Sequence, residues 1–432
     1  MPMKELAINI IGYINKQFGL GEGTRANIRA LRAANISTCI NEFNHNINKE
    51  ILDQEHQEVD VLSNQNSHPI NIVQLNFDKL TSFIENYSDT YLKGKYNIGF
   101  WVWELERFPE VAHVYFDLFD EIWTPSNYSA ESISLYSPIP VINIPHSIEI
   151  LNVPHDRDYF DLSQDNYYFL TIFDYNSSIE RKNPIGVIDA YELAFGKNHP
   201  TVKLVIKASE RPNFESEKQL IDSRLSENAS IIYIEKTLTR EEIHSLIKQC
   251  NCFISLHRSE GFGLTMAEAM YLNIPVIATD YSGNKDFMNT NNGFLVKYKL
   301  VSAELYNKFS IAEDMWAEPD IADAAEKMKF VFHNPMEANK LASRGNKDIQ
   351  ERNSPEYIGA KMRARLNFIQ NNLLKKGSGK DLLQEISKQK IEISLLNDKL
   401  ESIKNLPYIQ MKVKFKNFKN RYLGKDKKYI WE

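Results

Sequence analysis

An apolar run, a pair of glycines and a second apolar run occupy residues 252–272, and this order constrains the fold more than any other part of the sequence. Residues 252–256 are typical of a buried strand, and MAEAMYL (266–272) is typical of a helix. The glycine pair therefore lies where a strand turns into a helix. Such a turn directs free backbone N–H groups and the positive end of the helix dipole at one point, which favours an anion such as phosphate.

Two glutamates flank this turn. Glu260 precedes it, and Glu268 lies about one helical turn inside the helix. Carboxylates beside a phosphate are unfavourable unless they accept hydrogen bonds from neutral groups, and a hydrogen bond to a charged group contributes about 1.5–3 kcal/mol. Sugar hydroxyls are such donors, so the pattern predicts a nucleotide-sugar site. The amides expected at its phosphates belong to Gly261, Phe262, Gly263 and Leu264.

Two adjacent cations, Arg181 and Lys182, follow another predicted strand at 168–173. Open sheets of parallel strands bind ligands at the carboxyl ends of the strands, so both cations are placed to neutralise a diphosphate. The alternative is a solvated pair at the start of the next helix, where the helix dipole disfavours cations. We therefore favour the binding role. Lys207, at the end of the next predicted strand, is a further candidate.

The pattern Glu260-x7-Glu268 with its inner GFGL resembles the donor-site signature of retaining glycosyltransferases of family 4, which have the GT-B fold. Other stretches resemble blocks of one bacterial branch of that family, and the resemblance extends from about residue 6 to about residue 375. These blocks are GYINKQFGLGEGTRANIRAL (12–31), GFWVWELERFPE (99–110), FDYNSSIERKNP (173–184), VIATDYSGNKDFM (276–288) and WAEPD (316–320).

The resemblance implies a role for each of these residues. Glu260 would accept hydrogen bonds from the donor sugar and Glu268 from the ribose, while Arg181 and Lys182 would bind the diphosphate. We expect Glu260, Arg181 and Lys182 to form the catalytic group. The glycine-rich loop around Gly21 would face the cleft near the donor phosphates. Without the resemblance this loop is weak evidence for a dinucleotide site, because its spacing is not G-x-G-x-x-G.

Three residues of the first half are candidates for contact with the acceptor or the sugar. Trp103 precedes Glu104, and an aromatic ring beside a carboxylate suits a sugar. A core tryptophan under a loop fits the sequence equally well. Many family members carry a histidine here, and this chain does not, which leaves the role of Glu104 open. His146, at the expected hinge, is the third candidate, whereas His257 at a strand end fits simple packing better.

Short apolar strands alternate with helical patterns along the chain, which predicts βα units, parallel sheets and an α/β fold. The GT-B resemblance implies two Rossmann-like domains that face a cleft, with a helical, coiled-coil-like C-terminal extension. The expected parts are an N-terminal acceptor-binding domain (1–150), a connector (151–165), a nucleotide-sugar domain (166–354), a crossover helix (355–375), a coiled-coil-like helix (380–405) and a basic tail (406–432). Residues 44–69 are polar and predict a surface insertion.

The last fifty residues differ in character from the rest. Apolar residues at alternating spacing in 382–403 span three heptads, the minimum for a coiled coil that would mediate oligomerisation. A single amphipathic helix docked on the body explains them equally well. Eight Lys and Arg residues lie between 411 and 432, although the whole chain carries a net charge of −6. This tail suits the anionic inner face of the cell membrane, and a merely solvated tail is the alternative.

Composition argues against several other classes of protein. No stretch approaches the ~18 uninterrupted apolar residues of a membrane span, and the N-terminus fits a first strand better than a signal peptide. Three cysteines are too few and too badly spaced for a disulfide framework. Asp156-Arg157-Asp158 resembles the metal-binding Asp-x-Asp of the other glycosyltransferase fold but lies in the connector. We expect a cytoplasmic protein, at most peripheral at the membrane, with no metal, no cofactor and no nucleic-acid partner.

Together these features predict a retaining hexosyltransferase. It would move a hexose-type sugar from a UDP- or GDP-sugar to a glycan or lipid-linked acceptor in surface polysaccharide biosynthesis. A nucleotide-sugar epimerase shares the fold and the ligand, but it needs acid and base groups around the sugar that the sequence does not supply. A non-catalytic GT-B subunit that uses 382–403 to bind a partner enzyme is the other alternative. Retention of Glu260, Glu268, Arg181 and Lys182 argues against it. The sequence leaves the donor base and sugar open.

Overall fold

The computed structural model describes residues 6–43, 62, 63, 65–87, 90–209, 215–303, 306 and 309–374. The chain divides into two compact units, Met1–Gly377 and Ser378–Glu432, and all the described residues belong to the first. The predicted helix at 380–405, with its 382–403 pattern, and the basic tail at 406–432 lie outside the described residues. Most of the polar segment at 44–69 does so as well.

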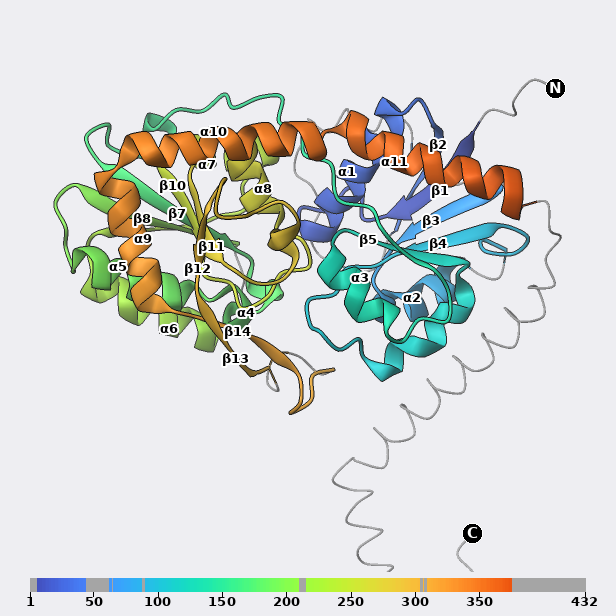
Figure 1. The fold of residues 1–432 in the computed structure, drawn as a ribbon, viewed down its shortest axis with the longest axis horizontal. Coiled ribbons are helices and arrows are strands. Elements are labelled where there is room, and N and C mark those ends of the chain that lie inside the picture. The colour runs from blue at the N-terminus through green and yellow to red at the C-terminus, as the bar shows by residue number, and fades with distance from the viewer. Residues whose placement is uncertain are drawn as a thin grey trace, which may run out of the picture. The chain divides into compact units, whose positions relative to one another are not determined.

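Two six-stranded parallel sheets form the centre of the first unit (Figure 1). The strand order is β2-β1-β3-β4-β5-β6 in the first sheet and β12-β11-β10-β7-β8-β9 in the second. We call the first sheet with its helices the N-lobe and the second sheet with its helices the C-lobe. The expected α/β fold with two parallel sheets is confirmed.

The four inner strands of the N-lobe sheet are short apolar runs that are buried on both faces, as is usual for parallel strands covered by helices. Its strands are β1 (Ala7–Gly12), β2 (Ser37–Glu42), β3 (Ile70–Gln74), β4 (Tyr96–Phe100), β5 (Glu121–Thr124) and β6 (Val141–Asn143). The helices that connect them are α1 (Gly19–Ala33), α2 (Phe77–Tyr87), a 3-10 helix (Glu110–Leu118) and α3 (Asn127–Ser134).

The C-lobe repeats this architecture after a connector that includes a short 3-10 helix, Asp158–Phe160. Its strands are β7 (Tyr167–Phe173), β8 (Val202–Ala208), β9 (Ile231–Glu235), β10 (Cys252–Ser255), β11 (Val276–Thr279) and β12 (Phe294–Val296). Its helices are α4 (Ile179–Lys182), α5 (Pro184–Phe195), α6 (Glu215–Glu227), α7 (Arg240–Gln249), α8 (Leu264–Tyr271), α9 (Ile321–His333) and α10 (Pro335–Arg352). An antiparallel pair, β13 (Tyr298–Ser302) and β14 (Met315–Pro319), follows β12.

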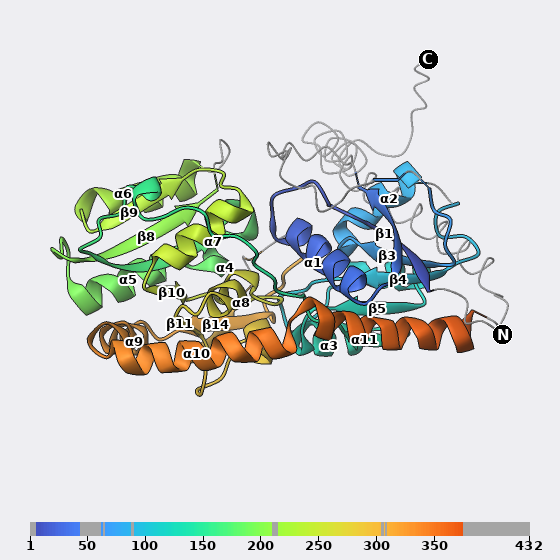
Figure 2. The same cartoon turned by 90° about the horizontal axis from the view of Figure 1, so that it is seen from above.

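The chain returns to the N-lobe at its end, through α11 (Pro355–Phe368). Helices α10 and α11 run end to end along one side of the two sheets (Figure 2). Ile358, Met362 and Leu366 of α11 are buried in the same apolar cluster as the N-lobe strands. Gly359 allows α11 to approach α1 closely, because a Cβ there would lie 2.2 Å from the carbonyl oxygen of Ala30.

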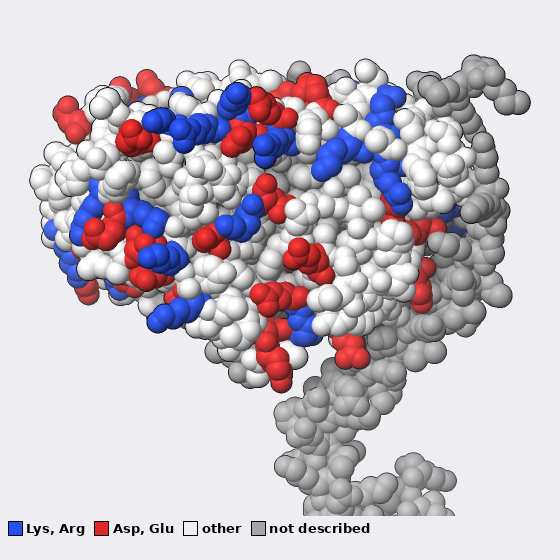
Figure 3. Space-filling model, in the orientation of Figure 1, with Lys and Arg blue, Asp and Glu red and all other residues white. Residues whose placement is uncertain are grey.

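The outer face of α10 is highly charged. In the view of Figure 3, basic side chains gather over α10 and α11 with acidic ones among them. The buried side of α10 is small and apolar, with Ala338, Ala342 and Ile349 turned inward. This amphipathic pattern keeps α10 on the surface of the C-lobe.

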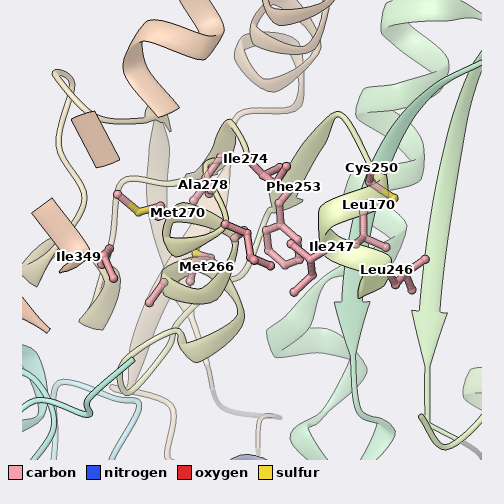
Figure 4. Close-up of a cluster of buried hydrophobic side chains, with 14 of the residues drawn as sticks. Leu170, Leu246, Ile247, Cys250, Phe253, Met266, Met270, Ile274, Ala278 and Ile349 are labelled. Atoms are coloured by element: carbon pink, nitrogen blue, oxygen red, sulfur yellow. The ribbon is translucent and has the colours of Figure 1, made fainter. Parts of the chain in front are cut away.

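An apolar cluster beneath α8 fixes the position of that helix. Met266 and Met270 of α8 pack with Leu246 and Ile247 of α7 and with Phe253 of β10 (Figure 4). All five side chains are 1% exposed or less. The start of α8, where the glycine pair lies, is therefore held by a close-packed core.

Candidate functional site

The loop that joins β10 to α8 is the centre of the candidate site. Gly263 lies at the N-cap of α8 with φ 98°, in the left-handed region that favours glycine, and no side chain caps the helix. Within the described part of the chain, the amides of residues 261–264 donate no hydrogen bond to another residue. The strand-to-helix turn predicted from the sequence is confirmed, and it directs free N–H groups at one point.

Neighbouring backbone holds this loop in place. The amide of Glu260 donates to Ser282 Oγ at 2.8 Å, and the amide of Gly283 donates to the carbonyl of Glu260 at 2.9 Å. Two glycines permit the close packing: a Cβ at Gly283 would lie 2.5 Å from the carbonyl oxygen of Gly261, and a Cβ at Gly261 would lie 2.3 Å from Val102 Cγ1. The last contact joins the loop to the N-lobe.

Arg181, Lys182 and Glu260 come together as the sequence predicts. Lys182 Nζ pairs with Glu260 Oε1, and Arg181 NH1 lies 3.2 Å from Glu260 Oε2. Arg181 NH1 also donates to the carbonyl of Ser259 at 2.8 Å. Burial opposes ionisation of Glu260, but Lys182 and Arg181 outweigh it and lower its pKa to about 2. Glu260 is therefore a charged carboxylate held between two cations.

The location of the two cations differs from the sequence interpretation. Arg181 and Lys182 do not open a helix: they end the single turn α4, and Asn183 in the left-handed region separates them from α5. The dipole at the end of a helix favours cations, so the dipole argument used for them above is wrong. Their burial is the better argument, because the Arg181 and Lys182 side chains are 6% and 20% exposed.

A second carboxyl group and an aromatic ring adjoin Arg181. Glu104 Oε1, from the N-lobe, lies 3.9 Å from Arg181 NH2, and the ring of Tyr306 lies 5.9 Å from the guanidinium carbon. Burial raises the pKa of Glu104; Arg181 opposes this and Glu260 adds to it. The sequence placed Glu104 near the sugar, and the structure brings it beside the Arg181–Glu260 pair.

Glu268 lies in a separate buried ion network that the sequence analysis missed. Arg240 NH2, at the start of α7, pairs with Glu268 Oε1, and His244 Nε2 lies 3.7 Å from the same oxygen. Arg240 Nε lies 3.4 Å from Glu22 Oε2 of α1. Burial raises the pKa of Glu268, but Arg240 and His244 outweigh it and lower the pKa. A usable signal existed: Arg240 is a cation at a helix start, where the dipole disfavours it.

Two further candidates, Gly21 of α1 and Lys207 of β8, are buried. Gly21 lies in the first turn of α1, where a Cβ would lie 2.2 Å from the carbonyl oxygen of Lys16. Close packing against the segment that precedes α1 therefore explains why this residue is glycine. Lys207 is 6% exposed near the end of β8, the strand beside β7. Binding roles for both stay predictions.

Trp103 and His257 are packing residues in the structure. Trp103 is 5% exposed, its indole N–H donates to the carbonyl of Arg107 at 2.7 Å, and its ring packs on Phe77. It does not present an open ring to a sugar, so the core interpretation fits it better. His257 is fully buried, with Nδ1 3.0 Å from Ser255 Oγ.

His146 occupies a junction between the lobes. Its ring stacks on Phe100 of the N-lobe, with ring centroids 5.4 Å apart, and meets Phe262 of the loop between β10 and α8 edge-on, with centroids 5.3 Å apart. Gly23 is close to it, because a Cβ there would lie 2.7 Å from His146 Cε1. Burial lowers the pKa of His146 to about 4, with Glu22 opposing. His146 is therefore neutral at physiological pH and packs against the loop between β10 and α8.

Among the described residues, no group of three or more His, Cys, Asp or Glu side chains is arranged to hold a metal ion. No helix in the described part combines the length and apolar character that crossing a bilayer requires.

Residues 169–315 match the model of the family described as glycosyl transferases group 1. The chain contains a glycosyltransferase group 1 domain. The match covers β7 to the start of β14, and therefore includes Arg181, Lys182, Glu260 and Glu268. The expected glycosyltransferase domain is thus confirmed at this level.

Curated relatives of this glycosyltransferase domain are distant. The GtfA subunit of UDP-N-acetylglucosamine–peptide N-acetylglucosaminyltransferase from Streptococcus agalactiae is 33% identical over 82 residues, or 18% of this chain. The capsular polysaccharide biosynthesis glycosyltransferase CapM of Staphylococcus aureus is 23% identical over 195 residues, or 45% of this chain. The matches span only 16% and 44% of the lengths of these two relatives.

Similarity in structure extends further along the chain. HepE of Anabaena, solved in complex with UDP and glucose, superposes with a TM-score of 0.61 at 12% sequence identity. The superposition covers 84% of this chain and 100% of HepE. At this identity the similarity establishes the fold, which is GT-B.

Proposed function

We propose that the glycosyltransferase moves a hexose-type sugar from a UDP- or GDP-sugar to a glycan or lipid-linked acceptor, with retention at the anomeric carbon as in family 4. The observation that carries this proposal is the convergence of Arg181, Lys182 and Glu260 beside the free amides of 261–264. Cations and amides suit a diphosphate, and carboxylates beside them suit hydroxyls.

Donor binding would exchange partners within this group. In the protein alone Lys182 and Arg181 are paired with Glu260. A diphosphate would take over the two cations and the amides of 261–264, which leaves the Glu260 oxygens to accept from the sugar hydroxyls. Glu268 would accept from the ribose, because its Oε2 is buried and has no partner among the described residues. Gly21 and Lys207 would lie near the phosphates.

The chemical step is a same-face displacement. The bond from the anomeric carbon to the phosphate oxygen breaks while the bond to the acceptor oxygen forms, and the departing phosphate takes the acceptor proton. Arg181, Lys182 and the amides stabilise the negative charge that grows on the leaving group. We propose that neither a metal nor a cofactor takes part. Lobes that close on both substrates supply proximity and exclude water that would hydrolyse the donor.

The N-lobe would bind the acceptor. Glu104 projects toward Arg181 from this lobe and is placed to accept a hydroxyl of the sugar or of the acceptor. The similarity to CapM supports a place in surface polysaccharide biosynthesis. We further propose that the basic tail holds the enzyme at the inner face of the cell membrane and that 382–403 mediates oligomerisation.

The test begins with a thermal-shift screen of the purified chain over UDP-, GDP- and dTDP-sugars. The donor that binds is then incubated with the chain, and release of the nucleoside diphosphate is measured. Lys182→Gln is expected to lower this release about 100-fold. The matched control is Lys327→Gln, which breaks a Lys–Asp pair on α9 and is expected to leave release unchanged. Failure of every donor to bind contradicts the proposal, and an inverted product linkage contradicts retention.

A further inference from the structure

We infer that Arg240 is a positioning residue that ties the ribose-binding carboxylate, Glu268, to helix α1 through Glu22, so that nucleotide binding and contact between the lobes strengthen one another. This inference rests on the proposed function. Arg240 had no role in the sequence analysis, and it need not touch the donor to act in this way.

The position of Arg240 is unfavourable unless its partners compensate. It is the first residue of α7, whose start is already capped by Thr239 and Glu242 in a reciprocal capping box. A cation there opposes the helix dipole, and the Arg240 side chain is only 19% exposed. The two carboxylates that it contacts, Glu268 and Glu22, supply the compensation.

The two carboxylate oxygens of Glu268 differ in their contacts: Arg240 pairs with one, and the other is left for a ligand. Oε1 pairs with Arg240 and has His244 Nε2 at 3.7 Å. Oε2 is buried and accepts no hydrogen bond from the described residues. A buried carboxylate oxygen without a donor is costly, and a ribose hydroxyl would satisfy it. Arg240 thus orients Glu268 so that one oxygen is left for the ligand.

Glu22 of α1 connects Arg240 to the N-lobe. Its carboxylate contacts Arg240 at 3.4 Å, Arg29 at 2.6 Å and Arg25 at 3.0 Å. Since Arg25 and Arg29 lie on α1 with Glu22, loss of Arg240 leaves Glu22 paired within its helix. Loss of Glu22 leaves Glu268 paired with Arg240. Substitution of Glu22 therefore removes the link to α1 while the Arg240–Glu268 pair remains, so the two contacts of Arg240 can be tested separately.

The charged and titratable groups that face Glu268 are Arg240 and His244 from α7 and Glu22 from α1. Of these groups, Arg240 contributes most to keeping Glu268 ionised. Without it, burial and Glu22 both favour the protonated carboxyl group, which accepts hydrogen bonds poorly. The affinity of an Arg240 variant for a nucleotide should therefore fall as the pH falls, relative to the unaltered protein.

Calorimetric titration with UDP and with GDP tests whether Arg240 positions Glu268 for nucleotide binding. For the nucleotide that the unaltered chain binds, we expect Arg240→Gln to raise Kd about tenfold at pH 7.5 and more at pH 5.5. The ratio of Kd values at each pH cancels titration of the nucleotide itself. Arg240→Lys keeps a charge beside Glu268, so its Kd ratio should not change with pH. Arg224→Gln, which breaks a pair with Asp189 and Glu192, is the matched control and should match the unaltered chain.

Hydrogen exchange of the α1 amides tests whether Arg240 and Glu22 link nucleotide binding to α1. UDP or GDP should slow exchange in α1 of the unaltered chain, and this effect should be lost in Arg240→Gln and in Glu22→Gln. Glu22→Gln should keep a Kd ratio that does not change with pH. Equal, pH-independent affinity in Arg240→Gln, or full nucleotide protection of α1 in both variants, overturns the inference while the proposed function stands. If the unaltered chain binds neither nucleotide, the proposed function fails and the inference fails with it.

Discussion

Arg107 and Asp314 form a bidentate ion pair, with Nε 2.7 Å from Oδ1 and NH2 2.8 Å from Oδ2. Arg107 follows β4 in the N-lobe, and Asp314 directly precedes β14 in the C-lobe. The Asp314 side chain is 1% exposed and also accepts from the amide of Ile311. A buried carboxylate thus receives its charge partner from the opposite lobe.

Replacement of Arg107 by Gln should destabilise the protein. Asp314 would stay buried without its two guanidinium donors, which costs about 1–3 kcal/mol of unfolding free energy. Urea denaturation at pH 7, followed by circular dichroism, measures the difference. The matched control is Lys329→Gln, which breaks an exposed pair with Glu326 and should change the free energy by less than about 0.5 kcal/mol. An Arg107 variant as stable as the unaltered chain would show that the pair contributes nothing.

Glu260→Gln should lower turnover more than it weakens donor binding. The substitution keeps the size of the side chain but removes the charge that accepts from the sugar hydroxyls, while Arg181 and Lys182 remain to bind the diphosphate. We expect kcat to fall about 100-fold and KM for the donor to change less. Steady-state release of the nucleoside diphosphate separates the two constants. The control is Glu192→Gln on α5, and a change in KM alone would argue against the assigned role.

Gly283→Ala should disrupt the loop that joins β10 to α8. The added Cβ would lie 2.5 Å from the carbonyl oxygen of Gly261, so backbone must move, and we expect a loss of about 1–3 kcal/mol in stability together with weaker nucleotide binding. Gly19→Ala is the matched control, because a Cβ there meets nothing within 4 Å. Thermal unfolding and calorimetric titration measure the two effects. Equal stability and equal nucleotide affinity of the two variants would mean that the loop can accommodate the added methyl group.

Stability should decrease when the pH falls from about 6.5 to about 4, in part because of His146. Its pKa in the folded protein is about 4, below the ordinary value near 6.5, so in this window the unfolded chain binds a proton that the folded chain does not. The contribution is therefore present above pH 6.5 and is lost as the pH falls through 4. His146→Gln should flatten the curve by up to about 3 kcal/mol at pH 4. Urea denaturation at several pH values measures it; an unchanged slope contradicts the assignment.

The strands were predictable where burial on both faces leaves a run of apolar residues. The strands predicted at 168–173 and 252–256 follow from such runs, and the structure has them as β7 (Tyr167–Phe173) and β10 (Cys252–Ser255). β2 (STCINE) was missed because it is an edge strand with only two apolar residues in its middle. β13 was missed because it is largely exposed and pairs only with β14, through contacts distant in sequence.

The candidate site was predictable where one loop carries the chemistry. Glu260 and Glu268 flank a glycine turn, so sequence order alone places both beside the loop from β10 to α8, although their charge partners differ. Arg240 was missed because its meaning depends on Glu22, a residue more than two hundred positions away that only the tertiary structure brings into contact. Trp103 shows the converse: its neighbours in sequence suited a sugar, but an aromatic cluster buries its ring.

The return of α11 to the N-lobe decides when the interior of that lobe can be completed during synthesis. The N-lobe sheet is synthesised first, yet its apolar cluster includes Ile358, Met362, Leu366 and Ile369 from the end of the first unit. On the ribosome, the N-lobe cluster therefore stays incomplete until α11 has been synthesised, after the C-lobe helices that end at Arg352. A gene cut between the lobes would leave the first fragment without one wall of its interior.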